Sequence, residues 1–114
     1  MYAADAASIY EIRNQTPRTV GSSYAVAEAE DWEFAVFSGR VIATNYNDHV
    51  VSLAIGTGSF TSHITAPTTL SDTPKAKHIG VVRNQLVLGY TNSVTDGAQP
   101  NQVRWSAIGD SRDF

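Results

Sequence analysis

Residues 32–46, WEFAVFSGRVIATNY, decide the fold, because two runs rich in β-branched and aromatic residues flank the pair Ser38-Gly39. Such runs fit a pleated, half-buried surface, and a Gly-containing pair between them is typical of a β-hairpin turn. Asn47-Asp48 then turns the chain into HVVSLAI, and residues 56–59, GTGS, turn it into FTSHI. The sequence therefore predicts a complete antiparallel meander of four short strands over residues 32–64.

The same pattern returns 45 residues later. Aligning Glu33–Asn47 with His78–Asn92 at a constant shift matches the apolar residues 34, 36, 37 and 41–43 with the apolar residues 79, 81, 82 and 86–88. The shift also places the turn Ser38-Gly39 over Arg83-Asn84, so the second segment is predicted to be another hairpin. A period of about 45 residues is in the range of propeller blades rather than helical solenoids.

A third strand is predicted at residues 102–108, QVRWSAI, after a longer loop at Asn92–Asn101, and it leads into the end of the segment 103–114, VRWSAIGDSRDF. This segment has a weaker copy at residues 51–60, VSLAIGTGSF. Both copies contain Ala-Ile-Gly, then a small polar loop, then Phe, whereas Trp105 and the acidic residues are not repeated. What repeats is the strand and its exit turn, and Trp105 is therefore expected to serve in packing.

The beginning of the chain gives further strand signals. Residues 2–4 and 8–12 predict a hairpin with a short loop. The cluster Asn14–Pro17 is expected to break the strand, because proline cannot donate a ladder hydrogen bond. Residues 24–31, YAVAEAED, lack a helical stripe and are expected to be irregular or extended, and residues 66–74 form a polar connection.

These observations predict one all-β module over residues 1–114, built of antiparallel four-stranded meanders that resemble propeller blades. Residues 2–12 form the end of one blade, residues 32–64 a complete blade and residues 77–114 a partial blade. A single meander leaves open faces and edges, so it has to pack against a neighbour. Because these units are too few to close a ring, three interpretations stay open: a fragment of a longer propeller, an open sandwich, or a chain that completes itself by oligomerising.

Composition excludes several classes of protein. The chain has 114 residues, a formal charge of −3 and no cysteine. Its eight basic residues are scattered, so a basic nucleic-acid-binding face is not expected, and disulfides and thiolate metal sites are excluded. No run approaches the roughly 18 apolar residues of a membrane helix, and the first residues do not resemble a signal peptide.

No set of residues predicts a catalytic, cofactor or metal site. His49, His63 and His78 lack metal-ligand spacing and are interpreted as strand-surface or turn residues. Asp110 and Asp113 flank a polar turn, where aspartate caps its own backbone. No serine has the context of a nucleophile elbow, so the chain is not expected to be an enzyme.

The aromatic side chains allow two interpretations. Trp32, Trp105 and several tyrosines could form a platform for stacking sugars, or they could pack between blades. Packing is the preferred interpretation. The tyrosines concerned are Tyr10, Tyr24, Tyr46 and Tyr90.

The order of segments IYEI, W-x-F, RVIATN, PKAKHIGVVRNQLVLG and VRWSAIGD-x-x-x-F resembles β-propeller-type virion proteins of tailed bacteriophages. The closest comparison is with tail nozzle, head-completion and packaged-DNA-stabilisation proteins, which sit below the portal in short-tailed phages. The resemblance covers residues 8–114, and its best single marker is residues 105–110, WSAIGD.

The resemblance implies a structural component of a virion, in the tail nozzle or hub or in a head-to-tail completion ring. Its partners are then portal or tail subunits and further copies in a ring, with DNA only as passing cargo and no membrane or cofactor. The alternative is a carbohydrate- or receptor-binding β module of a phage tail.

Overall fold

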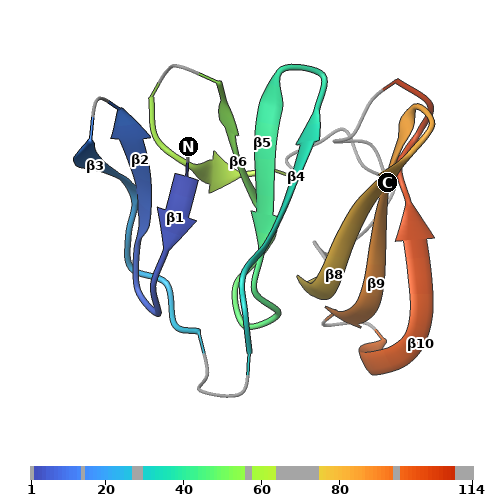
Figure 1. Cartoon of the computed structure of the whole chain (residues 1–114). Helices are drawn as coiled ribbons and strands as arrows, with labels where there is room; N and C mark the ends of the chain where they lie inside the picture. Colours follow the sequence, from blue (N-terminus) through green and yellow to red (C-terminus); the bar gives the residue numbers. More distant parts are fainter. Residues whose placement is uncertain are drawn as a thin grey trace.

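The computed structural model describes residues 2–13, 15–26, 30–55, 58–63, 75–93 and 96–109. In these ranges the regular structure is entirely β, without a helix, and ten strands form three antiparallel sheets. The sheets follow one another in chain order across the molecule (Figure 1). The all-β class predicted from the sequence is therefore confirmed.

Each sheet is a meander of consecutive strands. Sheet A contains β1 (Tyr2–Ala4), β2 (Ile9–Arg13) and β3 (Thr16–Gly21). Sheet B contains β4 (Glu33–Phe37), β5 (Arg40–Thr44), β6 (Val51–Ala54) and β7 (Thr61–Ser62). Sheet C contains β8 (Lys75–Val82), β9 (Gln85–Ser93) and β10 (Gly97–Trp105).

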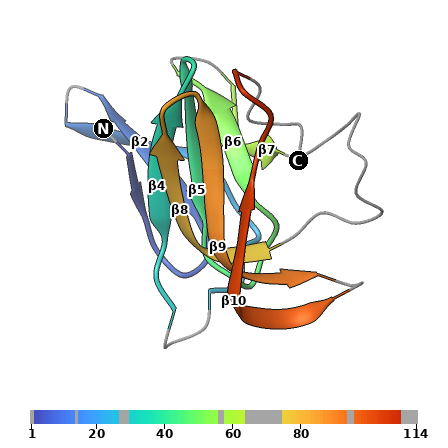
Figure 2. The ribbon, with the colours of Figure 1, turned by 90° about the vertical axis from the view of Figure 1, so that its right-hand side faces the viewer.

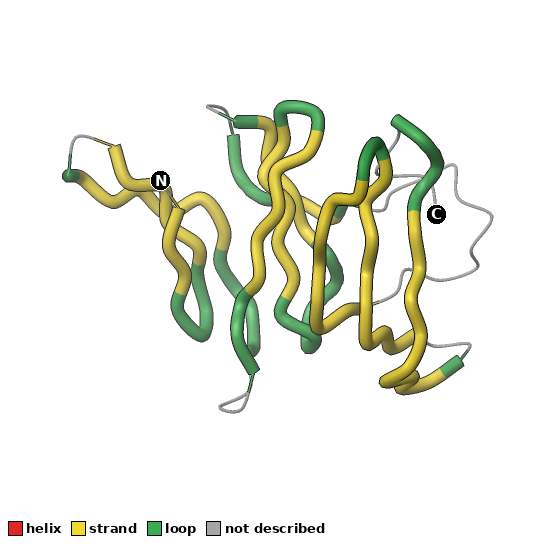
Figure 3. Tube along the Cα trace, turned by 45° about the vertical axis from the view of Figure 1, so that its right-hand side comes forward, coloured by secondary structure: helices red, strands yellow, loops and turns green. Residues whose placement is uncertain are grey.

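Sheet B lies between the other two sheets and is covered on both faces (Figures 1 and 3). We call the face of a sheet that points toward the next sheet along the chain its front face, and the opposite face its rear face. Successive side chains of a strand point to opposite faces, so Val41 and Ala43 lie on the rear face of sheet B and Ile42 lies on its front face. All three are buried, which explains why β5 reads as a continuous apolar run rather than an alternating one.

Two hydrophobic clusters join the three sheets. The first packs Ile9 and Val20 of sheet A against the rear face of sheet B and the nearby Phe60, with Tyr2, Tyr24 and Trp32 at its margin. The second packs the front face of sheet B against the rear face of sheet C. Its buried members are Phe37, Ile42, Val50, Ala76, Leu86 and Leu88.

The two predicted hairpins are present, and they are built alike. Phe37 pairs with Arg40 and Val82 pairs with Gln85, which leaves the two-residue turns at 38–39 and 83–84. Ser38 and Arg83 both have a φ of 53°, in the left-handed region that such turns require. In each unit the segment after the third strand donates a backbone hydrogen bond to the turn, from Ile55 N to Gly39 O (3.0 Å) and from Gly109 N to Asn84 O (2.7 Å).

The four-stranded meander expected over residues 32–64 is present as sheet B, β4-β5-β6-β7, but four strands are wrong as a rule for the other sheets. Among the described residues, sheets A and C have three strands each, and sheet B has three strands plus the two-residue β7 at its edge. These strands form an open stack of three sheets and no closed propeller. Residues 64–74, which include the whole predicted polar connection at 66–74, lie outside the described residues.

Pro17 does not break the strand as expected. It lies inside β3 and pairs with Ile12 of β2. Because β3 is an edge strand, it has a neighbour on one side only, and an edge strand tolerates a residue that lacks an N–H. The turn before it is made by Gln15, whose φ is 65°.

The long loop expected at Asn92–Asn101 is also wrong, because β9 continues to Ser93 and β10 already begins at Gly97. The pairing of β10 with β9 shifts between Gln99 and Val103, where Pro100 interrupts the ladder. Sheet C bends sharply in this region, and the beginning of β10 turns away from the rest of the sheet (Figure 2). Residues 24–26 and 30–31 have no regular structure, as predicted, and residues 27–29 lie outside the described residues.

Candidate functional site

The front face of sheet C carries the most prominent exposed apolar surface of the described chain. Trp105 of β10 pairs with Val87 of β9. Val103 precedes Trp105 by two residues in the same strand, so its side chain lies on the same face. Val82, at the end of β8, shares that face. The exposed fractions are 58% for Val82, 53% for Val103 and 62% for Trp105, and Val87 is partly buried.

The expectation that Trp105 serves in packing is not met within the described chain, because its indole is 62% exposed on the front face of sheet C. Trp32 does pack. Its Nε1 donates to the carbonyl oxygen of Asp5 at 2.8 Å, and its ring meets Tyr24 edge-on, with the ring centroids 5.0 Å apart. Tyr46 and Tyr90 also form an edge-to-face pair, at 5.3 Å. The rings of Tyr24, Trp32, Tyr46 and Tyr90 are thus packed against other rings, whereas the Trp105 indole is exposed.

An open groove of about 660 Å³ combines acidic and aromatic side chains between the start of the chain and the segment before β4. The rings of Trp32 and Phe34 lie stacked at its wall, with centroids 6.1 Å apart and planes 25° apart. Glu30 at the groove is paired with Lys77 Nζ of sheet C, 3.5 Å from its Oε2. The residues that line the groove are Ala4, Asp5, Ala6, Val26, Glu30, Asp31, Trp32 and Phe34.

Asp5 organises the turn beside this groove. Its Oδ1 accepts hydrogen bonds from the backbone N–H groups of Ala7 (2.9 Å) and Ser8 (2.8 Å), and its Oδ2 accepts one from the Tyr10 hydroxyl (3.2 Å). These hydrogen bonds stabilise the carboxylate and hold the pKa of Asp5 below its ordinary value of 3.8, and the two backbone donors have the largest effect. Its acidity therefore reflects a turn-capping role.

Tyr24 is held between this turn and sheet B. Burial, and secondly the charge of Asp48, raise the pKa of its phenol above 10.0. Asp48 itself accepts from the backbone N–H of Ala25 at 3.0 Å and from Asn45 Nδ2 at 2.9 Å. The turn-forming role expected for Asp48 agrees with these contacts.

A serine and a histidine form a fully buried pair that the sequence did not reveal. His63 Nδ1 lies 2.8 Å from Ser52 Oγ, and Arg40 donates to the same oxygen from Nε (3.2 Å) and from an η nitrogen (3.1 Å). The interpretation of His63 as a surface or turn residue is wrong, because it is completely buried. A hydroxyl that accepts from a guanidinium and lies out of reach of solvent is not an available nucleophile, so the pair fastens β7 and the segment after it to β6.

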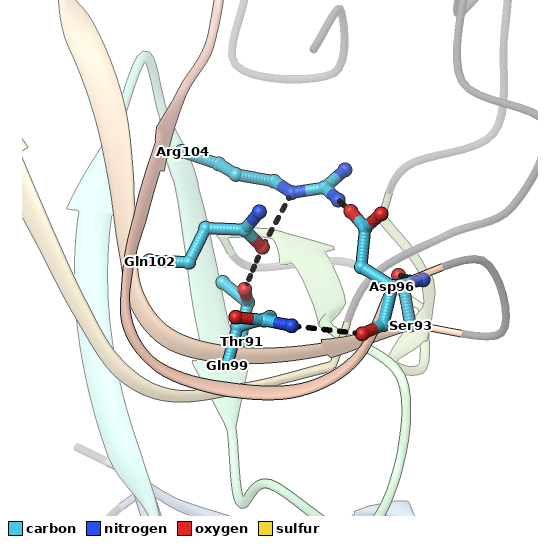
Figure 4. Close-up of polar contacts among 6 residues, drawn as sticks. All are labelled: Thr91, Ser93, Asp96, Gln99, Gln102 and Arg104. Carbon is cyan, nitrogen blue, oxygen red and sulfur yellow. Dashed lines mark hydrogen bonds and ion pairs between the residues drawn. The ribbon is translucent and has the colours of Figure 1, made fainter.

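A second polar network fixes the bend of sheet C (Figure 4). Arg104 donates from Nε to Gln102 Oε1 at 3.0 Å and from an η nitrogen to Asp96 Oδ2 at 2.6 Å. Gln102 Oε1 also accepts a hydrogen bond from the Thr91 hydroxyl. Each charged group of this network has a partner within the network, so these contacts stabilise the bend of sheet C.

The other candidate site residues, two histidines and two aspartates, do not form a cluster among the described residues. His78 is exposed on β8 and contacts Glu33, and the described His49 lies apart in the segment before β6. Asp110 and Asp113 lie outside the described residues. Among the residues that the structure does describe, no three His, Asp or Glu side chains are grouped so that they could hold a metal ion, and no helix is long and apolar enough to cross a membrane.

A scan against protein-family models, a search of curated proteins and a search of solved structures each found no match to this chain.

Proposed function

We propose that this chain is a structural component of a tailed-phage virion, in the tail nozzle or hub or in the head-to-tail completion ring. The segment that supports a phage assignment is residues 105–110, WSAIGD, together with the order of the preceding strand segments. The observation that carries the structural role is the front face of sheet C. It repeats the apolar chemistry of an interface inside the same chain, yet it is exposed.

In this role the stacked sheets supply rigid surfaces and no chemistry. The buried Ser52–His63 pair and the Arg104 network are explained by stability, because each joins strands of one sheet. Portal or tail subunits are the proposed partners, with DNA as passing cargo. An enzymatic role is not proposed, since the acidic and nucleophilic side chains described above serve turns and strand contacts.

The test is the location of the chain in particles of the phage that encodes it. Purified virions are analysed by mass spectrometry and labelled with gold-conjugated antibody raised against the chain. The proposal predicts that the chain is present in stoichiometric amounts, with label at the tail vertex. Particles that lack it, or label confined to the capsid surface, contradict the proposal.

A second candidate, a carbohydrate-binding β module, is favoured by the groove that contains Trp32 and Phe34. A stacked pair of rings beside Asp5 and Asp31 offers an apolar face and hydrogen-bond acceptors in one concavity, which is the composition of a small-molecule site. Glycan-array binding that is lost in Asp31→Asn, with Trp105→Ala unaffected, supports binding in this groove. Binding lost in Trp105→Ala alone places the ligand on the front face of sheet C, and no binding removes this candidate.

A further inference from the structure

We propose that the front face of sheet C binds the rear face of sheet A of a second copy of this chain, so that two copies close front to rear into a stack of six sheets. This docking rests on one part of the proposed function, namely that the front face of sheet C is an interface, and it identifies the partner of that face. It does not require that the chain come from a phage.

Sheets B and C are equivalent units of the sequence repeat. A shift of 45 residues carries Phe37 onto Val82 and Ile42 onto Val87. Matching Ala54 with Ala107 in the repeated Ala-Ile-Gly carries Val50 onto Val103. Phe37, Ile42 and Val50 are the buried residues of the front face of sheet B, and the rear face of sheet C covers them.

The corresponding side chains of sheet C remain apolar, although no described part of the chain covers them. Val82 and Val103 are more than half exposed, and Trp105 extends the same surface. In an antiparallel sheet with one face in water, the solvent-exposed face usually carries polar side chains. The exposed positions of sheet C carry apolar side chains instead. The front face of sheet C therefore has the composition of the interface that its counterpart makes inside the chain.

Among the described sheets, the rear face of sheet A is the surface that fits this face. Both described junctions, A with B and B with C, join a front face to a rear face. The rear faces of sheets B and C are already used in these junctions. The rear face that remains is that of sheet A, on the side opposite Ile9 and Val20. Strand alternation and pairing place Ala3, Tyr10, Ile12 and Thr19 there.

Charge favours the same pairing. Neither these four residues nor Val82, Val87, Val103 and Trp105 carry a formal charge. Strand alternation also places His78 on the front face of sheet C, and its Nδ1 already contacts Glu33, so docking buries no unpaired ion. Ala3 and Thr19 are small and exposed, and they leave room for the Trp105 indole beside Tyr10 and Ile12.

The number of copies follows from the way stacked meanders close. Radial stacks of antiparallel sheets close with about four to eight sheets. The described part of each chain supplies three sheets, and six is the one multiple of three in that range. A head-to-tail contact that closes after two copies satisfies both copies at once, without leaving an uncovered face.

The test is light scattering coupled to size exclusion, over a range of concentrations, on the wild-type chain and on two face variants. Trp105→Asp blocks the front face of sheet C, and Thr19→Asp blocks the rear face of sheet A. We expect the wild type to have the mass of two chains and each variant to fall to the mass of one. Val36→Asp, which changes an exposed valine of β4 outside both faces, is the matched control and keeps the mass of two chains.

Mixing the two variants decides between a front-to-rear contact and a symmetric one. A Trp105→Asp chain still offers an intact rear face, and a Thr19→Asp chain still offers an intact front face. In a mixed pair both faces of one junction are intact, whereas each variant alone has a substituted face in both junctions. We therefore expect the mixture to recover the mass of two chains, held by the intact junction, although neither variant does so alone. Circular dichroism confirms that both variants remain folded.

A wild-type chain that stays monomeric at every concentration, or a mixture that stays monomeric when the wild type is dimeric, overturns the docking. Either result leaves the particle-labelling experiment untouched, so failure of this contact and failure of the virion assignment are distinguishable. If Trp105→Asp and Val36→Asp weaken the assembly equally, the docking is also overturned, because the front face of sheet C is then not the contact.

Discussion

Phe37 and Val82 each stand directly before the two-residue turn of their hairpin, 45 residues apart, yet Phe37 is 8% exposed and Val82 is 58% exposed. The difference comes from the neighbouring sheet. Sheet C covers the front face to which Phe37 belongs, whereas no described part of the chain covers the front face to which Val82 belongs. Equivalent positions of the repeat are therefore both apolar, but they contribute differently to the free energy of unfolding.

This asymmetry predicts unequal effects of the same substitution. Phe37→Ala removes a buried ring from the second hydrophobic cluster and is expected to lower the free energy of unfolding by about 3–5 kcal/mol. Val82→Ala is expected to change it by no more than about 0.5 kcal/mol when the chain is monomeric. Urea unfolding at high dilution measures both, and equal losses would show that the two hairpins do not occupy the environments described.

The buried pair of Ser52 and His63 predicts a second stability difference. Ser52→Ala removes the oxygen that Arg40 and His63 both contact, and leaves buried polar groups unsatisfied. We expect a loss of about 1–3 kcal/mol in the free energy of unfolding. His78→Ala, at an exposed histidine of β8, is the control and is expected to cost less than about 1 kcal/mol.

An active-site role for Ser52 has a separate signature. A nucleophilic serine reacts with a fluorophosphonate probe, whereas a fully buried hydroxyl does not. We expect no labelling of the native chain. Labelling at Ser52 that disappears in His63→Ala contradicts the structural interpretation of the pair.

Asp5 predicts a pH dependence in the acid range. Because its folded pKa lies below 3.8, its contribution to stability is complete above the ordinary value and is lost as the pH falls through the lowered pKa. The amide proton shifts of Ala7 and Ser8 are expected to titrate together with a midpoint below 3.8, and this titration is expected to vanish in Asp5→Asn. A midpoint at or above 3.8 would mean that the backbone donors do not favour the carboxylate.

The hairpins could be predicted from sequence because their signals are local. Ser38-Gly39 and the apolar runs beside it encode the turn and both strands within a few residues, and the same holds at Arg83-Asn84. The continuous apolar run of β5 also agrees with its place in the middle of the stack, since both of its faces are covered.

Other features depended on partners distant in sequence. Pro17 is acceptable only because β3 lies at an edge, which is a property of the sheet rather than of the residue. His63 meets Ser52 only because β7 pairs with β6, and no spacing rule links these two residues. The exposure of Trp105 depends on which sheet faces are covered, and the count of strands alone does not determine it.

Trp105 offers the sharpest test that the front face of sheet C is an interface. The chain contains two tryptophans, so Trp32→Phe leaves Trp105 as the sole indole, and circular dichroism verifies the fold. Its fluorescence is recorded with and without acrylamide as the chain is concentrated. A blue shift and loss of quenching that rise together with the mass of two chains are the predicted result. An emission that stays that of a solvent-exposed, fully quenchable indole at every concentration contradicts it.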